Sequence, residues 1–571
     1  MTAAVAIPPS MPFPQLDAAV ERVKSHAREF AQLGLDERIA LMERVYRGYA
    51  EIAEESVRLA CAAKGIDFGS PLAGEEWLAG PVITVRNFRL TLEALIEVKK
   101  YGAPRVDPKW IRDLPDGRLA IQIYPANGID KALLAKHTGE VHLQPGITRE
   151  NLKEHQAVFY RKPHGGKLCL VLGAGNVNSI PPTDVIYKMF VEGTACVLKM
   201  NPVNAYVGPL IERAFAPLVA RGFFAVVYGE VAESVHLCEH PQVDEIHITG
   251  SDKTHDAIVW GTGPDGAARR AKNTPRLTKD ITSELGNISP VIVVPGPWDT
   301  ASLDFQARSV AGMVTNNASF NCNSAKLLLT SKGWDGRGRF LDGVSAHLAS
   351  GPMRQAYYPG AQERWKAFTD GRAHVKLIGQ QTPGALPYAL ITDVDLAKKD
   401  DKVFSVEPWC TVLSEAPIAA SDPAAFLEEA VRVCNEQVWG TLCATILVHP
   451  STLASPAGAA AVDKAIRALK YGSVAVNTWP AAVFGLGSLP WGGHPSSTLA
   501  DIQSGRGWVH NTFMFEGLEK TVLHAPAKGF PISPWFPAHR TLDALAKAVL
   551  ELEQGPSWLK VPKIAFNAMR G

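Results

Sequence analysis

The most constraining feature of the sequence is a regular alternation of apolar, β-forming segments with helical segments between Lys167 and His255. The β-forming segments read KLCLVLG, TACVLKM, FFAVVYG and DEIHITGS. Alternation at this spacing specifies right-handed β-α-β units and a parallel sheet with helices on both faces. A second run contains the segments SPVIVV, AKLLLTS, CATILVHP and SVAVNTW and a helical pattern over 303–314. The sequence therefore predicts two α/β domains.

The segments on either side of these domains have other patterns. Apolar residues recur at helical spacing from Leu16 to Lys100, and GRLAIQIYP and GEVHLQPG have the composition of strands. GWVHNTFMF, at 507–515, predicts an exposed edge strand, and a single helix is expected around 542–552. An edge strand beside the early strands could form a protruding sheet used for self-association.

Charge and cysteine usage narrow the class of protein. Lys and Arg number 58 against 57 Asp and Glu, so no net field favours nucleic acid as a partner. No run of about 18 apolar residues predicts a membrane span, and Met1–Gln15 lacks the pattern of a signal peptide. Eight scattered cysteines without a C-x-x-C pair are typical of reduced thiols, which predicts a cytoplasmic protein. Neither Cys nor His has the spacing of a metal site.

Two glycine-containing segments follow predicted strands and have two interpretations each. GAGNVNS begins like a dinucleotide-binding turn with Gly173 and Gly175, but Asn178 replaces its third glycine, so a plain strand-to-helix turn competes with that interpretation. In ITGSDKTHDA, Gly250 and Ser251 either bring backbone amides close to a phosphate or simply begin an N-capped helix.

A cysteine and two glutamates are the candidate chemical groups. Cys322 lies among polar residues in NNASFNCNSAK, surroundings that permit a thiolate if a helix start or a lysine lowers its pKa. Glu284 lies in TSELGNISP and Glu407 in FSVEPWCTVL. Lone glutamates are usually solvated, so neither segment alone indicates a function.

Read together and in order, several segments resemble the aldehyde dehydrogenase superfamily, of which this chain looks like a divergent, long member. They are GAGNVNS, LKMNP, HITGS, SELGNISP, SFNCNSAK, VEPWCTVL, AVNTW and PWGG, and they extend from about Phe159 to about Gly493. The resemblance implies an aldehyde dehydrogenase-like α/β fold, with two Rossmann-type domains and a small β oligomerisation extension. The implied divisions are a cofactor-binding domain at 1–118 and 146–287, a catalytic domain at 288–500, oligomerisation strands at 119–145 and 501–525, and a carboxy-terminal tail at 526–571.

The resemblance also implies a role for each matching residue. Cys322 would attack the aldehyde carbonyl, and the Asn176 side-chain amide and the Cys322 backbone N–H would bind the resulting oxyanion. Glu284 would activate the water that releases the acid. Lys199, Gly250, Ser251 and Glu407 would bind the cofactor, either NAD or NADP. A homodimer or homotetramer that acts on a small-molecule aldehyde is expected, with no nucleic-acid partner.

Three departures from the family pattern leave parts of this assignment open. Asn176 lies in GNVNS, where Asn178 is a rival, although a separation of 199 − 176 = 23 residues from Lys199 favours Asn176. Pro202 stands where many NAD-using members carry a Glu. Cys322 follows Glu284 by 322 − 284 = 38 residues, which implies a small insertion that should leave the catalytic groups in place.

Two other functions and the substrate remain open from the sequence. A CoA-acylating aldehyde dehydrogenase, or an acyl-CoA reductase working in reverse, would share the cysteine but generally lacks a base at position 284. An inactive scaffold of the same fold is a second alternative. Phe320, Trp409 and Trp479 lie near the matching segments and predict an apolar or aromatic aldehyde. No role for the tail after about Pro526 follows from the sequence, and its simplest interpretation is a surface arm that packs on a neighbouring subunit.

Overall fold

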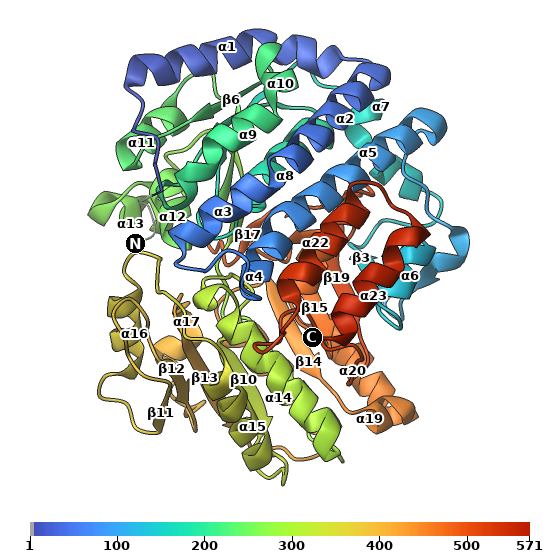
Figure 1. Cartoon of the computed structure of the whole chain (residues 1–571), viewed down its shortest axis with the longest axis vertical. Coiled ribbons are helices and arrows are strands. Elements are labelled where there is room, and N and C mark those ends of the chain that lie inside the picture. The colour runs from blue at the N-terminus through green and yellow to red at the C-terminus, as the bar shows by residue number, and fades with distance from the viewer. Residues whose placement is uncertain (1–4) are drawn as a thin grey trace.

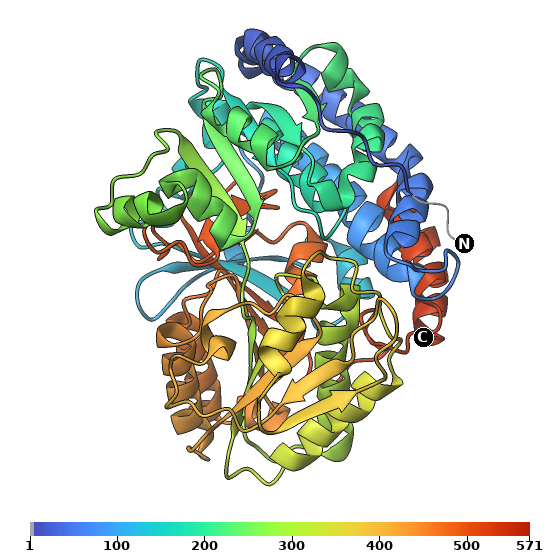
Figure 2. The same cartoon turned by 90° about the vertical axis from the view of Figure 1, so that its left-hand side faces the viewer.

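The alternating segments between Lys167 and His255 form the predicted parallel sheet in a computed structural model that describes residues 5–571 (Figures 1 and 2). Met1–Ala4, part of the segment considered for a signal peptide, lie outside the described residues. The sheet has six strands, all parallel except β17, in the order β17 (Gly505–Arg506), β8 (Asp280–Leu285), β7 (Glu245–Gly250), β4 (Leu168–Leu172), β5 (Ala195–Lys199) and β6 (Phe224–Val227).

Helices cover this sheet because its central strands are apolar along their whole length. Every residue of β4 and β5 is buried, as a strand enclosed on both faces requires. The helices that pack on the sheet are α1 (Phe13–Gln32), α8 (Ile180–Phe190), α9 (Gly208–Ala214), α10 (Ala216–Ala220), α11 (Val231–Glu239) and α12 (Asp252–Trp260), and α13 (Gly263–Ala271) packs on α12. The expected helical region before the sheet consists of α1 (Phe13–Gln32), α2 (Leu35–Glu51), α3 (Ala53–Ala63), α4 (Ala73–Trp77) and α5 (Ile83–Tyr101).

The second α/β domain is built on an eleven-stranded sheet in the other lobe of Figure 2. Its strand order is β1 (Ile111–Asp113), β2 (Leu119–Tyr124), β3 (Thr138–Leu143), β19 (Leu518–His524), β15 (Ser473–Val476), β14 (Cys443–Leu447), β9 (Pro290–Val293), β10 (Leu327–Ser331), β13 (Val412–Ile418), β12 (Tyr388–Ile391) and β11 (Val375–Ile378). One face packs on α14 (Thr300–Thr315) and α15 (Arg337–Ser350), and the other on α18 (Pro423–Glu436) and α20 (Pro456–Ala468).

The two segments expected to form oligomerisation strands meet in this sheet. β3 pairs antiparallel with β2 on one side and with β19 on the other, and β1 is the edge. Self-association through this edge stays a prediction.

The edge strand predicted at 507–515 was wrong. Only Trp508–Val509 form a strand, β18, which pairs with β16 (Trp491–Gly492) inside the protein. His510 and Met514 adopt left-handed backbone conformations, which interrupt an extended strand. The Asn511 side chain accepts a hydrogen bond from the Phe515 N–H and donates one to its carbonyl, so side chain and backbone bond within a buried turn.

The carboxy-terminal tail packs on its own chain, and a contact of the tail with a neighbouring subunit stays a prediction. It contains two helices, α22 (Leu542–Glu553) and α23 (Val561–Met569), and Figure 1 shows α22 beside α4 and α5. Glu553 is buried and pairs with Arg86 at 2.7 Å and with Arg89 at 2.6 Å, both on α5. The tail therefore completes the packing of the amino-terminal helices.

No helix within residues 5–571 combines the length and the apolar character that crossing a bilayer requires. Within the same residues, His, Cys, Asp and Glu side chains nowhere gather in threes as a metal site would demand.

Candidate active site

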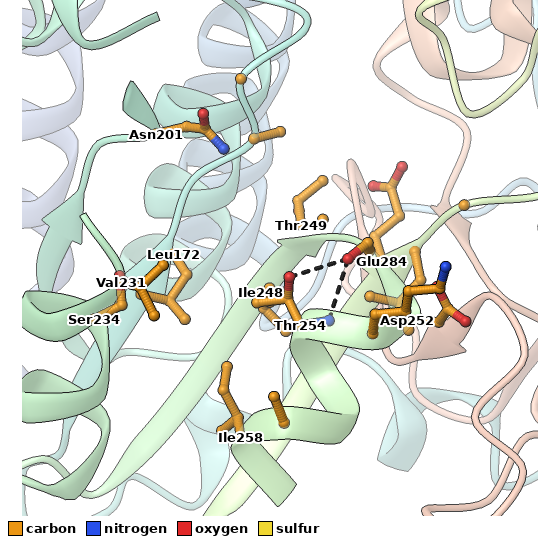
Figure 3. Close-up of a pocket in the computed structure, with 18 of the residues that line it drawn as sticks. Leu172, Asn201, Val231, Ser234, Ile248, Thr249, Asp252, Thr254, Ile258 and Glu284 are labelled. Atoms are coloured by element: carbon orange, nitrogen blue, oxygen red, sulfur yellow. Dashed lines mark hydrogen bonds between the residues drawn. The ribbon is translucent and has the colours of Figure 1, made fainter. Parts of the chain in front are cut away.

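A cavity of about 930 Å³ opens at the carboxyl ends of β4, β5, β7 and β8 and reaches inward to Cys322. Ligands bind at this end of open α/β sheets because the loops that follow the strands leave a crevice there. Figure 3 shows Leu172, Val231 and Ser234 toward one side of the cavity and Glu284 toward the other. The seven residues predicted for the site all line this cavity or touch its inner end: Asn176, Lys199, Gly250, Ser251, Glu284, Cys322 and Glu407.

Lys199, Gly250 and Ser251 lie where two strands of the sheet end. Lys199 is the last residue of β5, and burial lowers the pKa of its ammonium group. Gly250 is the last residue of β7, and Ser251 caps α12 by accepting a hydrogen bond from the Thr254 N–H at 3.1 Å. Amides at the beginning of α12 therefore border the cavity beside a small residue, an arrangement suited to a phosphate.

Apolar side chains border the outer part of the same cavity. Val231 is 76% exposed and Val235 is 43% exposed, both on α11. Exposed apolar side chains at the mouth of a polar cavity are suited to pack against the flat face of an aromatic base.

The structure separates the two rival asparagines. Asn176 lines the cavity, and its side-chain amide donates to the Phe320 carbonyl at 2.9 Å, two residues before Cys322. Asn178 is buried away from the cavity, where its amide donates to the Tyr206 hydroxyl at 3.4 Å. An amide nitrogen carries two hydrogens, so Asn176 keeps one N–H for a ligand beside Cys322.

Cys322 and Glu284 meet at the inner end of the cavity. The Cys322 Sγ lies 3.5 Å from Glu284 Oε1, within the distance for a sulfur hydrogen bond, so the longer separation in sequence does not hold the two groups apart. Glu284 is on β8, and Cys322 is in the turn between η5 (Asn316–Ser319) and β10. Burial, with a smaller contribution from the Asp184 carboxylate, raises the pKa of Glu284 to about 8. Groups tuned to titrate near neutral pH are suited to proton transfer.

The expectation that the surroundings of Cys322 permit a thiolate was wrong for this arrangement. Burial, and then the neighbouring Glu284 carboxylate, raise the pKa of the Cys322 thiol well above its usual value. The residues adjacent in sequence are polar, but Cys322 packs in space against an apolar cluster that includes Val177, Tyr187 and Trp491. Cys322 therefore rests as a thiol in this arrangement, with the Glu284 carboxylate as its hydrogen-bond partner.

Two residues around Glu284 were missed by the sequence analysis. The Trp491 indole N–H donates to Glu284 Oε1 at 2.7 Å, although the residues are 207 positions apart. Asp184 is fully buried and accepts a hydrogen bond from the Thr249 hydroxyl at 2.8 Å; Thr249 is the register partner of Glu284 in the adjacent strand. PWGG contains Trp491, but nothing in that segment indicates a contact with the base.

Glu407 is mostly shielded from solvent and paired, with 14% of its side chain exposed, unlike the solvated state that is usual for lone glutamates. Its carboxylate lies 2.9 Å from the Lys326 Nζ, and a side chain at Gly286 would overlap it, since a Cβ there would come 2.0 Å from Glu407 Oε2. Lys326 also donates to the Cys322 carbonyl at 3.3 Å. Lys326 therefore links the cysteine turn to Glu407. No role for this lysine was predicted from the sequence.

Of the three aromatic residues proposed near the site, only Trp409 lines the cavity. Phe320 is buried in the core beside Tyr357 and Tyr358, with ring centroids 5.0 Å and 5.5 Å away. Trp479 is buried too, and its indole donates to the Asn323 carbonyl at 2.7 Å. The prediction that Phe320 and Trp479 lie near the substrate was therefore wrong.

We expect Trp491→Phe to move the pH dependence of turnover to higher pH. The indole hydrogen bond stabilises the Glu284 carboxylate and lowers its pKa, so losing it raises that pKa above about 8. A base acts only when unprotonated, so its rate is lost as pH falls through its pKa, and the midpoint should rise by roughly 1 unit. Steady-state rates across pH measure this. Trp508→Phe, on the paired strand, is the control, and an unchanged midpoint in Trp491→Phe would show that the indole does not stabilise the base.

Together, a doubly wound sheet, a cavity at its carboxyl edge and a thiol beside a buried carboxylate have the features of an α/β enzyme site in which Cys322 is the candidate nucleophile. Comparison with known proteins agrees. Residues 132–358 match the model of the aldehyde dehydrogenase family. An N-succinylglutamate 5-semialdehyde dehydrogenase of Burkholderia mallei is 24% identical over 380 residues, which cover 62% of this chain and 72% of the relative.

Two solved structures have a similar fold. An NADP-dependent glyceraldehyde-3-phosphate dehydrogenase of Bacillus halodurans, complexed with NADP, has a TM-score of 0.60 at 17% identity, covering 90% of this chain and 92% of that one. An indole-3-acetaldehyde dehydrogenase in complex with NAD+ has a TM-score of 0.58 at 19% identity, covering 90% of this chain and 89% of that one. The chain is therefore similar to aldehyde dehydrogenases at low sequence identity, and the match to the family model extends over residues 132–358.

Proposed function

We propose that this protein oxidises an aldehyde to the carboxylic acid with NAD+ or NADP+, through a thiohemiacetal and then a thioester on Cys322. The observation that carries the proposal is the 3.5 Å contact between the Cys322 Sγ and the Glu284 carboxylate at the inner end of the cavity. A nucleophile within reach of a general base is the arrangement that covalent catalysis needs.

The residues of the cavity fit a nicotinamide dinucleotide. The volume of the cavity, about 930 Å³, is at the upper end of the range for ligand sites. The amides at the start of α12 suit a pyrophosphate, and Val231 and Val235 of α11 suit the face of an adenine. Lys199, Gly250, Ser251 and Glu407 would hold the cofactor. Pro202, which also lines the cavity, contributes no carboxylate to repel a 2′-phosphate, so both NAD+ and NADP+ are candidates. When bound, the cofactor supplies the acceptor for the hydride.

The first half of the reaction uses Cys322, Glu284 and Asn176. As the thiol attacks the aldehyde carbonyl, its proton passes to Glu284, and a carbon–sulfur bond forms while the carbonyl π-bond breaks. The oxyanion so formed would be bound by the free Asn176 N–H and the Cys322 backbone N–H. Preorganised donors stabilise such an intermediate strongly. Loss of hydride from the carbon then leaves a thioester.

The second half of the reaction releases the acid. Glu284, again a carboxylate after losing its proton to solvent, takes a proton from a water molecule that attacks the thioester carbon. The carbon–sulfur bond breaks, the acid leaves, and Cys322 returns as a thiol. Retention of a base at position 284 supports hydrolysis over transfer of the acyl group to CoA.

An apolar or aromatic aldehyde is the substrate we propose. The apolar cluster against which Cys322 packs supports it, because its core includes Ile180, which also lines the cavity, and the aromatic residues Phe484 and Trp491. An apolar side chain beside a nucleophile stabilises an apolar substrate chain because their contact removes apolar surface from water. A charged semialdehyde, the type of substrate named for the Burkholderia relative, would need a charged partner in this cluster.

The test is the absorbance of reduced cofactor formed by the purified protein with octanal, benzaldehyde or a charged semialdehyde. Each is offered with NAD+ or NADP+, and with or without CoA. Turnover of octanal or benzaldehyde without CoA is the expected result. Turnover only with CoA would replace hydrolysis by acylation, a preference for the semialdehyde would overturn the substrate proposal, and cofactor binding without any turnover would indicate an inactive scaffold.

A further inference from the structure

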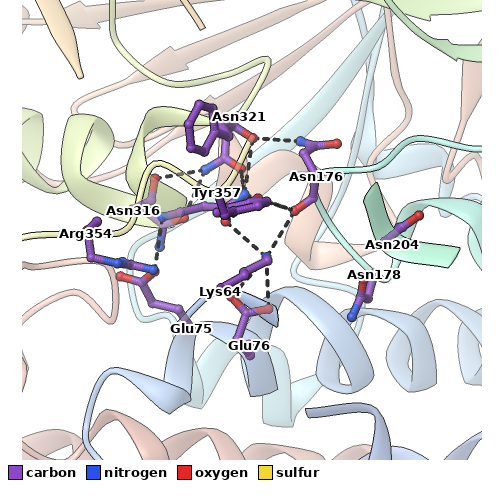
Figure 4. Close-up of polar contacts among 12 residues, drawn as sticks. Lys64, Glu75, Glu76, Asn176, Asn178, Asn204, Asn316, Asn321, Arg354 and Tyr357 are labelled. Carbon is purple, nitrogen blue, oxygen red and sulfur yellow. Dashed lines mark hydrogen bonds and ion pairs between the residues drawn. The ribbon is translucent and has the colours of Figure 1, made fainter. Parts of the chain in front are cut away.

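A buried polar network centred on Lys64 lies behind the candidate oxyanion site (Figure 4). Lys64 follows the last residue of α3, and only 6% of its surface is exposed. Its Nζ donates to both carboxylate oxygens of Glu76 on α4, each at 3.0 Å. The same nitrogen reaches the Asn176 carbonyl at 3.1 Å and the Asn317 Oδ1 at 3.0 Å. The ammonium group is therefore fully partnered without water.

The partners of Lys64 are the backbone and side chains that flank Cys322. The Asn176 carbonyl accepts two further hydrogen bonds, from the Asn317 amide and from the Tyr357 hydroxyl, both at 3.1 Å. The single hydrogen of the Tyr357 hydroxyl is shared with Asn317 Oδ1, which lies 2.9 Å from the hydroxyl oxygen. Finally, the Asn317 amide donates to the Phe320 carbonyl at 3.2 Å, the same carbonyl that accepts from the Asn176 side chain. The network thus joins both sides of the oxyanion site.

The turn that presents Cys322 needs such support. Asn317, Ala318 and Ser319 have φ values of 49°, 53° and 68°, in the left-handed region that residues with a Cβ rarely adopt. Besides its contact with Lys64, Asn317 is fixed through its backbone N–H, which donates to Glu75 Oε2 at 3.1 Å. Glu75 is itself paired with Arg354 at 2.7 Å. Three consecutive residues in this conformation persist only when their surroundings hold them.

We propose that Lys64 is a positioning residue for the reaction, an inference that rests on the proposed function. Together with Glu76, Asn317 and Tyr357, Lys64 fixes Asn176 and the cysteine turn so that the N–H groups of both meet the oxyanion. A buried ion pair is a poor way to gain stability, because apolar residues of similar size often serve as well or better. What it offers here is directed donors. Lys64 can hold one carbonyl and one amide oxygen at fixed positions, whereas an apolar side chain cannot.

The experiment compares two variants with the wild-type protein. Lys64→Met/Glu76→Leu removes both charges together, so that no buried charge is left unpaired, and Tyr357→Phe removes one hydroxyl and leaves the ion pair. We expect kcat and the rate of the first burst of reduced cofactor to fall about 100-fold in the double variant and about 10-fold in Tyr357→Phe. The KM for aldehyde and the Kd for reduced cofactor should stay within about twofold, since Lys64 touches neither ligand.

The matched control is the exposed ion pair on the same helix. Arg58→Met/Glu54→Leu removes the Arg58–Glu54 pair of α3, 2.6 Å apart, and should leave kcat and the burst unchanged. Wild-type burst rates in both network variants would overturn the inference, and so would losses that follow only the melting temperature. An inactive wild-type protein would instead overturn the proposed function and the inference with it, so the two failures are distinguishable.

Discussion

Cys322→Ala should abolish turnover and the initial burst of reduced cofactor together. Without the sulfur, no thiohemiacetal forms, and the aldehyde carbon has no electron-rich intermediate from which hydride can leave. The rate should fall by about 10⁴-fold or more, as when the nucleophile of a covalent mechanism is removed. The measurement is rapid-mixing absorbance of reduced cofactor, with binding of reduced cofactor followed by fluorescence.

Cofactor binding should survive in this variant, because Cys322 lies at the inner end of the cavity while Lys199 and α12 border its outer part. Cys434→Ala is the matched control, since this cysteine is buried in the core of the second domain. Residual turnover in Cys322→Ala above about one part in 10⁴ would mean that another residue is the nucleophile.

Glu284→Gln has the second largest expected effect and should separate the two halves of the reaction. The amide oxygen of a glutamine can still accept the Trp491 hydrogen bond, so the geometry should hold, but an amide does not accept a proton. We expect a burst of about one reduced cofactor per subunit, slower than in the wild-type protein, followed by turnover that is lower by about 10²- to 10⁴-fold. Mass spectrometry should then find the acyl group on Cys322.

The wild-type enzyme should lose turnover as pH falls through about 8, the pKa to which burial raises Glu284, because the base is then protonated. The steady-state rate of Glu284→Gln should lack this dependence. Normal turnover in Glu284→Gln would show that another group activates water, and recovery of turnover only on addition of CoA would show that a thiol can replace the water.

The secondary structure of the two domains could be predicted because its signal is local. Apolar strands such as β4 and β5 are buried on both faces, so their whole sequence is apolar. The segment at 507–515 misled because its aromatic and β-branched residues are typical of a strand, while their burial is decided by a turn that His510 and Met514 make. Composition alone does not reveal backbone conformation of that kind.

The site was predicted only in part, because sequence patterns are local whereas several contacts of the site join residues far apart in the chain. Cys322, Glu284 and Asn176 lie in segments that the family resemblance marks, and the structure brings them together. Lys64 lies 253 positions before Asn317, and no local pattern around it indicates the contact. The acidity of Cys322 was misjudged because the pKa of a thiol depends on its neighbours in space, which are apolar, and not on its polar neighbours in sequence.

The pairing of Glu553 with Arg86 and Arg89 determines when the molecule can finish folding. The glutamate follows the two arginines by 467 and 464 residues, so it leaves the ribosome last of the three. At roughly 5–20 residues per second, translation of that stretch takes about 25–90 s, during which Arg86 and Arg89 cannot pair with Glu553. The amino-terminal helices therefore reach their final packing only after the tail is made, because Ala546 and Leu550 of α22 belong to the same apolar core.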